Sequence, residues 1–418
     1  MTDLKNRIRQ ILLAESGEMF SREAIDEAQL RQAMMKVVNN LNYREGLNLS
    51  ENDKKRVIEE MLAEFVGMGP LDSLLRDPAV TEIMVNGPRK IYVERHGRKE
   101  LSRISLEDEN QLKYLVHKLL APTRRRVDEL SPYTDVSLRD GSRVNIVIYP
   151  VALDGTTITI RKFLKELKTI DDLVHLGTLD KRMATFLSAC ARAHVNIIFS
   201  GATGAGKTTT LNVLSSLIPK EERIITIEDT AELHLMQEHV VRLEARQTNI
   251  EGRGEITIRD LFRNSLRMRP ERIILGEIRG AEALDMLQAI CSGHRGSLSV
   301  LHANSPQEAV YRLETMILTS GIPVSLEIIH RQIAAAINLI VQQEQLLDGA
   351  RKITRITQVN GIKDSRAALE DIFYFEIDSV SAEGKVKGRW RATGIAPVFY
   401  PELRKEGVEL SKDIFNKD

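Results

Sequence analysis

Asn196–Thr210 reads NIIFSGATGAGKTTT, and this stretch carries the clearest structural signal in the chain. Its apolar run, Ile197–Phe199, predicts a short buried strand. Gly201–Thr208 follows and fits the pattern G-x-x-x-x-G-K-[ST] at every fixed position. Thr209–Leu217 then continues at helical spacing, and Pro219 ends the predicted helix. A strand, a glycine-rich loop and a helix in this order favour a phosphate-binding loop over a glycine turn that serves only packing.

The loop contains the residue types that binding of a triphosphate requires. Glycines adopt backbone angles that side chains forbid, so the main chain can approach a phosphate closely. The loop N–H groups and the positive end of the helix dipole then attract anionic oxygens. Lys207 would reach the β and γ phosphates, and the Thr208 hydroxyl would bind Mg²⁺, so we expect ATP and Mg²⁺ as cofactors. The residues expected to contact the nucleotide are Gly201, Ala202, Thr203, Gly204, Ala205, Gly206, Lys207, Thr208 and Thr209.

Length and composition narrow the class of protein. A chain of 418 residues suits two or three domains, and its 42% hydrophobic content is ordinary for an α/β protein. Lysine plus arginine and aspartate plus glutamate both number 59, so the total charge favours neither nucleic acid nor an anionic membrane as a partner. Cys190 and Cys291 are too few for a disulfide framework or a four-cysteine zinc site, and they indicate a reducing compartment.

The N-terminal sequence, MTDLKNRIRQILLAESGE, lacks the long uncharged core of a signal peptide. No stretch of the chain approaches the ~18 consecutive apolar residues of a membrane-spanning helix. We therefore expect a cytosolic protein that reaches a membrane only through partners or a surface patch.

The pattern of apolar residues divides the chain into four regions. Residues 1–66 show helical spacing and predict a helical region, which serves either as a structural bundle or as an interaction module. Residues 67–165 alternate short strands with turns around one helix, and they predict a small α+β domain. Residues 166–345 alternate apolar strands with helices, as in a parallel sheet. Residues 346–418 are expected to be a C-terminal extension that packs against this α/β domain.

The candidate strands can be given by residue. In the α/β region they are Asn196–Phe199, Arg223–Ile227, Val240–Leu243, Arg272–Leu275 and Leu298–Leu301. In the small domain, the runs Val136–Leu138 and Val144–Ile148 flank Asp140-Gly141, which predicts a hairpin, and Thr157–Arg161 is a further strand.

Two acidic stretches of the α/β region can serve phosphoryl transfer, which needs a positioned water and compensation of charge at the γ phosphate. Ile224–Glu232, IITIEDTAE, places carboxylates just after a strand, where open α/β sheets bind their ligands. Capping of a following helix is the alternative for these acids. Arg272–Glu277, RIILGE, resembles a Walker B segment with glycine in place of aspartate. Glu277 would reach the metal through water, and its alternative is a surface acid at a strand end.

Two histidines and two arginines complete the candidate set. His294 and His302 bracket the strand Leu298–Leu301, which suggests a polar network that senses the γ phosphate, although a lone histidine is more often structural. Arg263 and Arg267 are four residues apart and so share one face of a predicted helix. They would supply charge to the γ phosphate of an adjacent subunit, or else form a solvated basic face.

Four motifs together resemble those of the secretion ATPase superfamily, the motors of type II and type IV secretion and of type IV pili. They are GATGAGKTTT, ITIEDTAELHL, RPERIILGEIRG and SGHRGSLSVLHANS, in this order along the chain. Superfamily members share a P-loop, an acidic Asp box, a Walker B segment with Gly-Glu and a His box in the same order. Further segments resemble the Tad/Flp-pilus branch: GPLDSLLRDPAVTEIMVNGPRKIYVERHGR, RDGSRVNIVIYP, DIFYFEIDSV and GRWRATGIAP.

The resemblance implies an α/β fold with a RecA-like P-loop ATPase domain, a smaller N-terminal α+β domain and an N-terminal helical region. It also implies a homohexameric ring in which ATP lies between the two domains of each subunit. Hydrolysis would swing the small domain and drive a platform protein embedded in the inner membrane.

The resemblance also assigns roles to individual residues. By the pattern of the family, Glu232 is the general base and Glu277 is the Walker B glutamate, which holds the metal through water together with Thr208. The remaining assignments go to residues in matching motifs. His294 and His302 are the His-box pair, Arg263 and Arg267 are intersubunit arginines, and Arg143 and Arg161 resemble positions that close over the nucleotide.

We therefore expect an ATP-hydrolysing, cytoplasmic, hexameric motor for Tad/Flp-type pilus assembly or type II/IV secretion, bound peripherally to the inner membrane through partners. A nucleic-acid-dependent P-loop motor is one alternative, disfavoured by the neutral charge and the lack of interleaved aromatic and basic residues. A nucleotide-dependent scaffold without turnover is another, disfavoured by Glu232 and Glu277. The sequence does not distinguish extension of a fibre from retraction, and it does not identify the platform partner or the role of residues 1–66.

Overall fold

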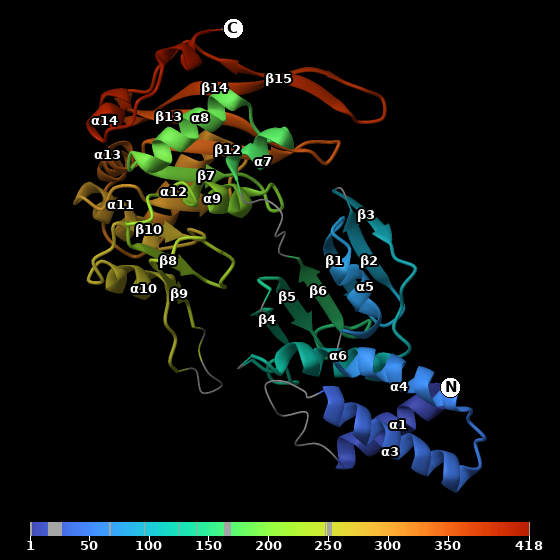
Figure 1. Ribbon diagram of the computed structural model, residues 1–418. Helices are drawn as coiled ribbons and strands as arrows, with labels where there is room; N and C mark the ends of the chain where they lie inside the picture. Colours follow the sequence, from blue (N-terminus) through green and yellow to red (C-terminus); the bar gives the residue numbers. More distant parts are fainter. Residues whose placement is uncertain are drawn as a thin grey trace. The chain divides into compact units, whose positions relative to one another are not determined.

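The computed structural model describes residues 2–15, 27–66, 68–95, 97–123, 125–138, 140–162, 169–246, 248 and 253–417. The chain forms two compact units, Met1–Phe163 and Leu164–Asp418, which we call the N-terminal unit and the C-terminal unit (Figure 1). The division into four regions made from the sequence stays a prediction.

Among the described residues, the N-terminal unit begins with the helices α1 (Thr2–Glu15), α3 (Glu27–Glu45) and α4 (Glu51–Val66). They bury the apolar residues whose helical spacing predicts them, among them Ile8, Leu12, Leu30, Met34, Val38, Ile58 and Met61. Tyr114 of α6 (Glu109–Leu120) packs against this cluster, so the helices share a surface with the rest of the unit.

A six-stranded antiparallel sheet forms the rest of this unit, in the order β3-β2-β1-β6-β5-β4. Its strands are β1 (Val80–Asn86), β2 (Ile91–Arg95), β3 (Arg98–Leu101), β4 (Tyr133–Ser137), β5 (Arg143–Val147) and β6 (Thr157–Arg161). Alternate residues of every strand except the exposed β3 form one core with η1 (Gly69–Leu71), α5 (Asp72–Arg76) and α6. The predicted hairpin is confirmed, because β4 and β5 pair directly with Val136 opposite Val144.

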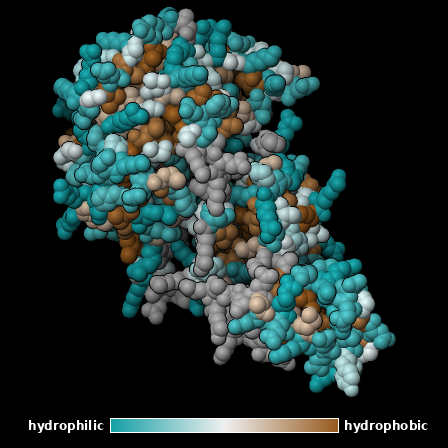
Figure 2. Space-filling view, viewed as in Figure 1, coloured by the Kyte–Doolittle hydropathy of each residue, from teal (hydrophilic) through white to brown (hydrophobic). Residues whose placement is uncertain are grey.

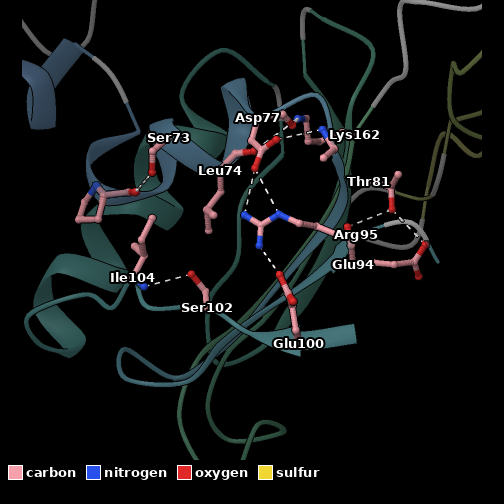
Figure 3. A network of polar contacts seen from close by, with 12 residues as sticks. Ser73, Leu74, Asp77, Thr81, Glu94, Arg95, Glu100, Ser102, Ile104 and Lys162 are labelled. Atoms are coloured by element: carbon pink, nitrogen blue, oxygen red, sulfur yellow. Dashed lines mark hydrogen bonds and ion pairs between the residues drawn. The ribbon is translucent and has the colours of Figure 1, made fainter. Parts of the chain in front are cut away.

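A polar network closes the N-terminal unit near its last described residue, Lys162 (Figure 3). Asp77 ends α5 and accepts two hydrogen bonds from the Arg95 guanidinium, at 3.2 and 3.0 Å. Arg95 also pairs with Glu100 of β3. Lys162 donates to the backbone carbonyl of Asp77 at 2.6 Å. These contacts hold the end of β6 against the helix that precedes the sheet.

The C-terminal unit is built on a nine-stranded mixed sheet in the order β15-β14-β13-β12-β7-β11-β10-β8-β9. The strands are β7 (Ile197–Ser200), β8 (Ile224–Glu228), β9 (Val240–Glu244), β10 (Arg272–Leu275), β11 (Leu298–Leu301), β12 (Leu339–Gln345), β13 (Arg351–Lys363), β14 (Arg366–Val380) and β15 (Val386–Ala392). From β12 to β9 all neighbours are parallel, and from β12 to β15 they are antiparallel.

Helices cover both faces of this sheet. One face is covered by α7 (Ile170–His175), α8 (Lys181–Arg192), α9 (Lys207–Ser215) and α14 (Tyr400–Lys405), and the other by α10 (Ile258–Ser265), α11 (Glu282–Cys291), α12 (Pro306–Leu318) and α13 (Leu326–Ala336). Every residue of β7, β8, β10 and β11 is consequently buried. Parallel strands enclosed in this way are near-continuous apolar runs, and the predicted α/β class is confirmed.

The C-terminal extension is part of the same sheet. β13 and β14, the two longest strands of the described chain, continue it through β12, and β15 forms its edge. The short helix η2 (Lys412–Phe415) inserts Phe415 beside Phe186 of α8, with ring centroids 5.3 Å apart. No strand was predicted from the sequence for β12 or β15. The extension therefore shares the hydrophobic core of the α/β region.

Hydrophilic side chains dominate the face of the molecule in Figure 2, with hydrophobic ones scattered among them. Within the part of the chain that the structure describes, no helix is both long enough and apolar enough to cross a membrane. Cys190 is buried and Cys291 is exposed, and both thiols are unbridged.

Candidate nucleotide-binding and catalytic site

The glycine-rich loop joins β7 to α9 at the carboxyl edge of the parallel strands. Gly206 has φ +96° and forms the N-cap of α9, a conformation that residues with a side chain rarely adopt. At Gly201, an added Cβ would lie 2.1 Å from the backbone oxygen of Gln343 on β12. The glycines are therefore required by the start of the helix and by the neighbouring strand.

Lys207 folds back onto this loop. Its Nζ donates to the carbonyl oxygens of Gly201 at 2.9 Å and Ala202 at 2.8 Å, and the residue is only 5% exposed. An ammonium held inside the loop is placed to meet the β and γ phosphate oxygens that such loops bind. Thr208 follows in the first turn of α9 and is partly buried. The donor set thus fits a nucleotide phosphate, and Thr208 offers one hydroxyl ligand for Mg²⁺.

A chain of charged side chains runs from Lys207 across the ends of the neighbouring strands. Nδ1 of His302, the residue after β11, lies 3.3 Å from Lys207 Nζ, and its Nε2 lies 3.4 Å from Glu277 Oε1. Glu277 Oε2 lies 2.7 Å from Arg279 Nη2, and Arg279 Nη1 lies 3.0 Å from an oxygen of Asp229. The chain brings the ends of β7, β11, β10 and β8 into one polar cluster.

The surroundings of His302 favour the neutral form of its imidazole. Burial and the charge of Lys207 lower the pKa of its imidazole, with Glu277 acting in the opposite direction. Since Lys207 can only donate, Nδ1 of His302 accepts and Nε2 carries the proton that points to Glu277. The ring of His302 therefore connects Lys207 to Glu277.

Glu228, at the end of β8, is the buried acid of the site and is 3% exposed. Its Oε2 accepts the backbone N–H groups of Glu232 at 2.7 Å and Leu233 at 2.9 Å. Burial raises the pKa of Glu228 to about 7, against the effect of these two hydrogen bonds. A Cβ added at Gly276 would lie 2.8 Å from Glu228 Cγ. Glycine in the Walker B segment therefore makes room for a carboxylate that arrives from the adjacent strand.

The predicted acids and one of the predicted histidines lie on this edge, but His294 does not. His294 precedes β11 and His302 follows it. The four residues of the strand separate them, each adding about 3.3 Å. The backbone around His294 lies at the amino ends of the parallel strands. The Ser297 hydroxyl donates to the carbonyl of His294, and the Ser297 carbonyl accepts the N–H of Ile197, the first residue of β7. The structure therefore does not bring the two histidines together within one chain.

The four predicted arginines belong to different units, with Arg263 and Arg267 in the C-terminal unit. Arg263 lies on α10 and donates to Asp285 of α11 at 2.9 Å. α10 ends at Ser265, and the N–H of Arg267 bonds three residues back to Asn264, so the shared helical face predicted for the two arginines is wrong. The other two belong to the N-terminal unit. Arg143 on β5 and Arg161 on β6 are direct cross-strand neighbours.

The sequence analysis assigned no individual role to three residues of the cluster: Glu228, Asp229 and Arg279. It named the acidic stretch that contains Glu228 and Asp229 as a candidate for phosphoryl transfer, and it did not consider Arg279. All three lie inside the quoted motifs, in IEDT and GEIRG. Their roles depend on a contact between two strands, β8 and β10, that a local pattern does not report. The available signal was the unusual glycine at Gly276, which implies that a neighbouring strand fills its space.

Comparisons with known proteins identify the family of the chain and relatives of similar fold. Residues 64–395 match the family described as Type II/IV secretion system protein. A putative conjugal transfer protein of Mycobacterium tuberculosis (strain ATCC 25618 / H37Rv) is 32% identical over 331 residues, which cover 74% of this chain and 94% of that protein. Protein VirB11 of Agrobacterium fabrum (strain C58 / ATCC 33970) is 32% identical over 302 residues, covering 65% and 87%. A crystal structure of the pilus retraction motor PilT with bound ADP shares the fold, with TM-score 0.52 and 20% identity over 70% of this chain and 82% of that one.

Proposed function

Because the chain belongs to the Type II/IV secretion system protein family and is an ATPase motor of these systems, we propose that it powers assembly of a Tad/Flp-type pilus. The observation that carries the catalytic part is the continuous contact from Lys207 through His302 and Glu277 to Arg279. It links a phosphate-binding loop to paired acids at the carboxyl edge of the sheet, where open α/β sheets bind ligands.

The pilus assignment is supported by segments outside the ATPase motifs. The N-terminal segment GPLDSLLRDPAVTEIMVNGPRKIYVERHGR, which spans β1 and β2, resembles the Tad/Flp branch, and GRWRATGIAP at β15 does as well. The relatives bear names from conjugation and type IV secretion. The proposal therefore selects one machine among several that use related motors.

In the proposed reaction, Lys207 and the loop N–H groups bind the β and γ phosphates. Thr208, and Glu277 through water, would hold Mg²⁺, which would neutralise charge on these phosphates. Glu232 accepts a proton from the attacking water, and Glu228 fixes the backbone of Glu232 through its N–H. As Lys207 turns to phosphate, its contact with His302 changes, and the change passes to Glu277 and Arg279.

Assembly and location are part of the same proposal. The motor is a homohexamer in the cytoplasm that reaches the inner membrane through a platform protein. Arg263 and Arg267 serve the site of an adjacent subunit, and Arg143 and Arg161 close over the nucleotide from the N-terminal unit.

The test compares Lys207→Ala with Lys220→Ala in the organism that makes this protein. Lys220 is exposed and follows the end of α9, so it is a matched lysine outside the loop. We expect Lys207→Ala to abolish surface fibres, counted by electron microscopy, and Lys220→Ala to retain them. Intact fibres together with loss of a secreted protein or of DNA transfer would contradict the pilus assignment.

A further inference from the structure

The β12–β13 hairpin touches the glycine-rich loop from its outer side. β12 runs parallel to β7 as far as Gln342, which lies opposite Ser200. The next residue, Gln343, places its backbone oxygen where a side chain at Gly201 would be. Its own side chain accepts the hydroxyl proton of Thr210 on α9 at 2.8 Å. Both ends of the loop are therefore set against one strand.

Arg351, the first residue of β13, lies across from Gln345 and reaches the middle of the loop. Its Nε donates to the carbonyl oxygen of Gly204 at 2.8 Å. Its Cδ lies 3.2 Å from the position that a Cβ would take at Gly206. A single cation from the C-terminal extension thus contacts two glycines of the loop, although 147 residues separate it from Gly204.

The hydrogen bond to Gly204 fixes one peptide group of the loop. Carbonyl and N–H groups of a trans peptide point in opposite directions, so holding the Gly204 oxygen outward aims the N–H of Ala205 inward. That N–H bonds inside the loop to the carbonyl of Ala202 at 3.3 Å. A bond to a charged donor is stronger than one between neutral groups, so Arg351 restrains the loop more than a neutral residue would.

The hairpin turn that presents Arg351 is itself anchored. Asp348 accepts the N–H of Ala350 at 3.0 Å within the turn. It also accepts the N–H of Val386, the first residue of β15, at 3.1 Å. The position of Arg351 is therefore set by two hairpins of the extension and not by the loop alone.

We propose that Arg351 is a positioning residue for nucleotide binding, which orders the glycine-rich loop from outside before the phosphate arrives. The proposal rests on nucleotide use by this ATPase and is independent of the pilus assignment. An ordered loop loses less conformational freedom on binding, so the effect of Arg351 falls on affinity for the nucleotide and not on the chemical step.

The test measures ADP binding by titration calorimetry, and kcat and KM for ATP hydrolysis, in the full-length protein. Arg351→Met keeps the aliphatic contact and removes the charge and the donor, whereas Arg351→Lys keeps the charge. Arg355→Met is the matched control, because Arg355 lies on the same strand and pairs with Asp371. We expect Arg351→Met to weaken ADP binding and raise KM about tenfold, as for loss of a hydrogen bond to a charged group, with kcat nearly unchanged.

Arg351→Lys should recover part of the lost affinity, and Arg355→Met should bind ADP as the unaltered protein does. Unchanged ADP affinity in Arg351→Met would overturn the proposal. So would a loss in which Arg351→Lys is no better than Arg351→Met and both lower the unfolding temperature, because that result indicates a packing role. If the protein binds ADP as expected but makes no pilus, the proposed function fails and this inference stands.

Discussion

The parallel strands of the C-terminal unit have the buried carboxylate of Glu228 at their carboxyl ends and the partly buried carboxylate of Glu222 at their amino ends, and the pKa values of the two acids shift in opposite directions. Glu228, at the carboxyl edge, is held by two backbone N–H groups, and burial raises its pKa to about 7. Glu222 lies just before β8, at the amino ends of the parallel strands. Burial also raises the pKa of Glu222, but His194 and Arg272 outweigh this effect and lower the pKa to about 2. The pKa values of two glutamates that flank the same strand, β8, thus differ widely, at about 2 and about 7.

The difference lies in what faces each carboxylate. Arg272 is wholly buried and directs its guanidinium at Glu222, with His194 Nε2 3.4 Å from the same acid. Glu228 has backbone dipoles and the near neighbour Gly276. An acid that is paired with a buried cation stays ionised and stabilises the fold. An acid with a pKa near 7 can instead gain or lose a proton during a reaction. The comparison teaches that burial alone does not mark a catalytic carboxylate.

The largest expected effect is on stability, and it concerns the ion pair of Arg272 with Glu222. Arg272→Met removes the fully buried cation that pairs with the partly buried Glu222, and we expect a loss of about 3–5 kcal/mol in the free energy of unfolding. The measurement is denaturant unfolding followed by circular dichroism. The double variant Arg272→Met with Glu222→Gln should recover most of the loss, because it removes both charges. A double variant as unstable as the single one would show that the ion pair is not the cause.

The next effect concerns pH. Because the pKa of Glu228 rises from 4.5 to about 7 on folding, its favourable contribution is complete below pH 4.5 and is lost as pH rises through 7. Glu228→Gln cannot ionise and keeps an acceptor for both N–H groups. We expect it to gain up to about 3 kcal/mol relative to the unaltered protein between pH 5 and pH 8. The measurement is urea unfolding across this range.

Glu222→Gln is the matched control with the opposite sign. Since the pKa of Glu222 is lowered, its contribution is present above pH 4.5 and is lost as pH falls through 2. Glu222→Gln should therefore be less stable than the unaltered protein at neutral pH, and the deficit should close in acid. A Glu228→Gln variant with the same pH slope as the unaltered protein would refute the raised pKa.

The features predicted best from the sequence are those that depend on a continuous run of neighbouring residues. β10 and β11 match their predicted residues, because buried parallel strands are unbroken apolar runs. The prediction of a strand, a glycine loop and a helix in this order is confirmed, although the predicted helical run was Thr209–Leu217 and α9 begins at Lys207 and ends at Ser215. A buried strand such as β12, LIVQQEQ, carries glutamines in its second half and gives no such run.

Contacts between distant strands were beyond local reasoning. The pairs Arg279 with Asp229 and Arg351 with Gly204 are separated by 50 and 147 residues, so no spacing rule reports them. The placement of His294 was within reach, because a residue that precedes a parallel strand lies at its amino edge, away from the site. The prediction that Arg267 shares a helical face with Arg263 was wrong, because α10 ends at Ser265, two residues before Arg267.

The central claim is that ATP is hydrolysed at the carboxyl edge, while the amino edge only holds the fold together. The most direct measurement is phosphate release per folded molecule for Glu277→Gln and Arg272→Met side by side. We predict a fall of more than about 100-fold for Glu277→Gln, as for loss of one group that stabilises the transition state. Arg272→Met should keep the kcat of the unaltered protein once its folded fraction is accounted for. Hydrolysis at the unaltered rate by Glu277→Gln, or loss of turnover in folded Arg272→Met, would contradict the account.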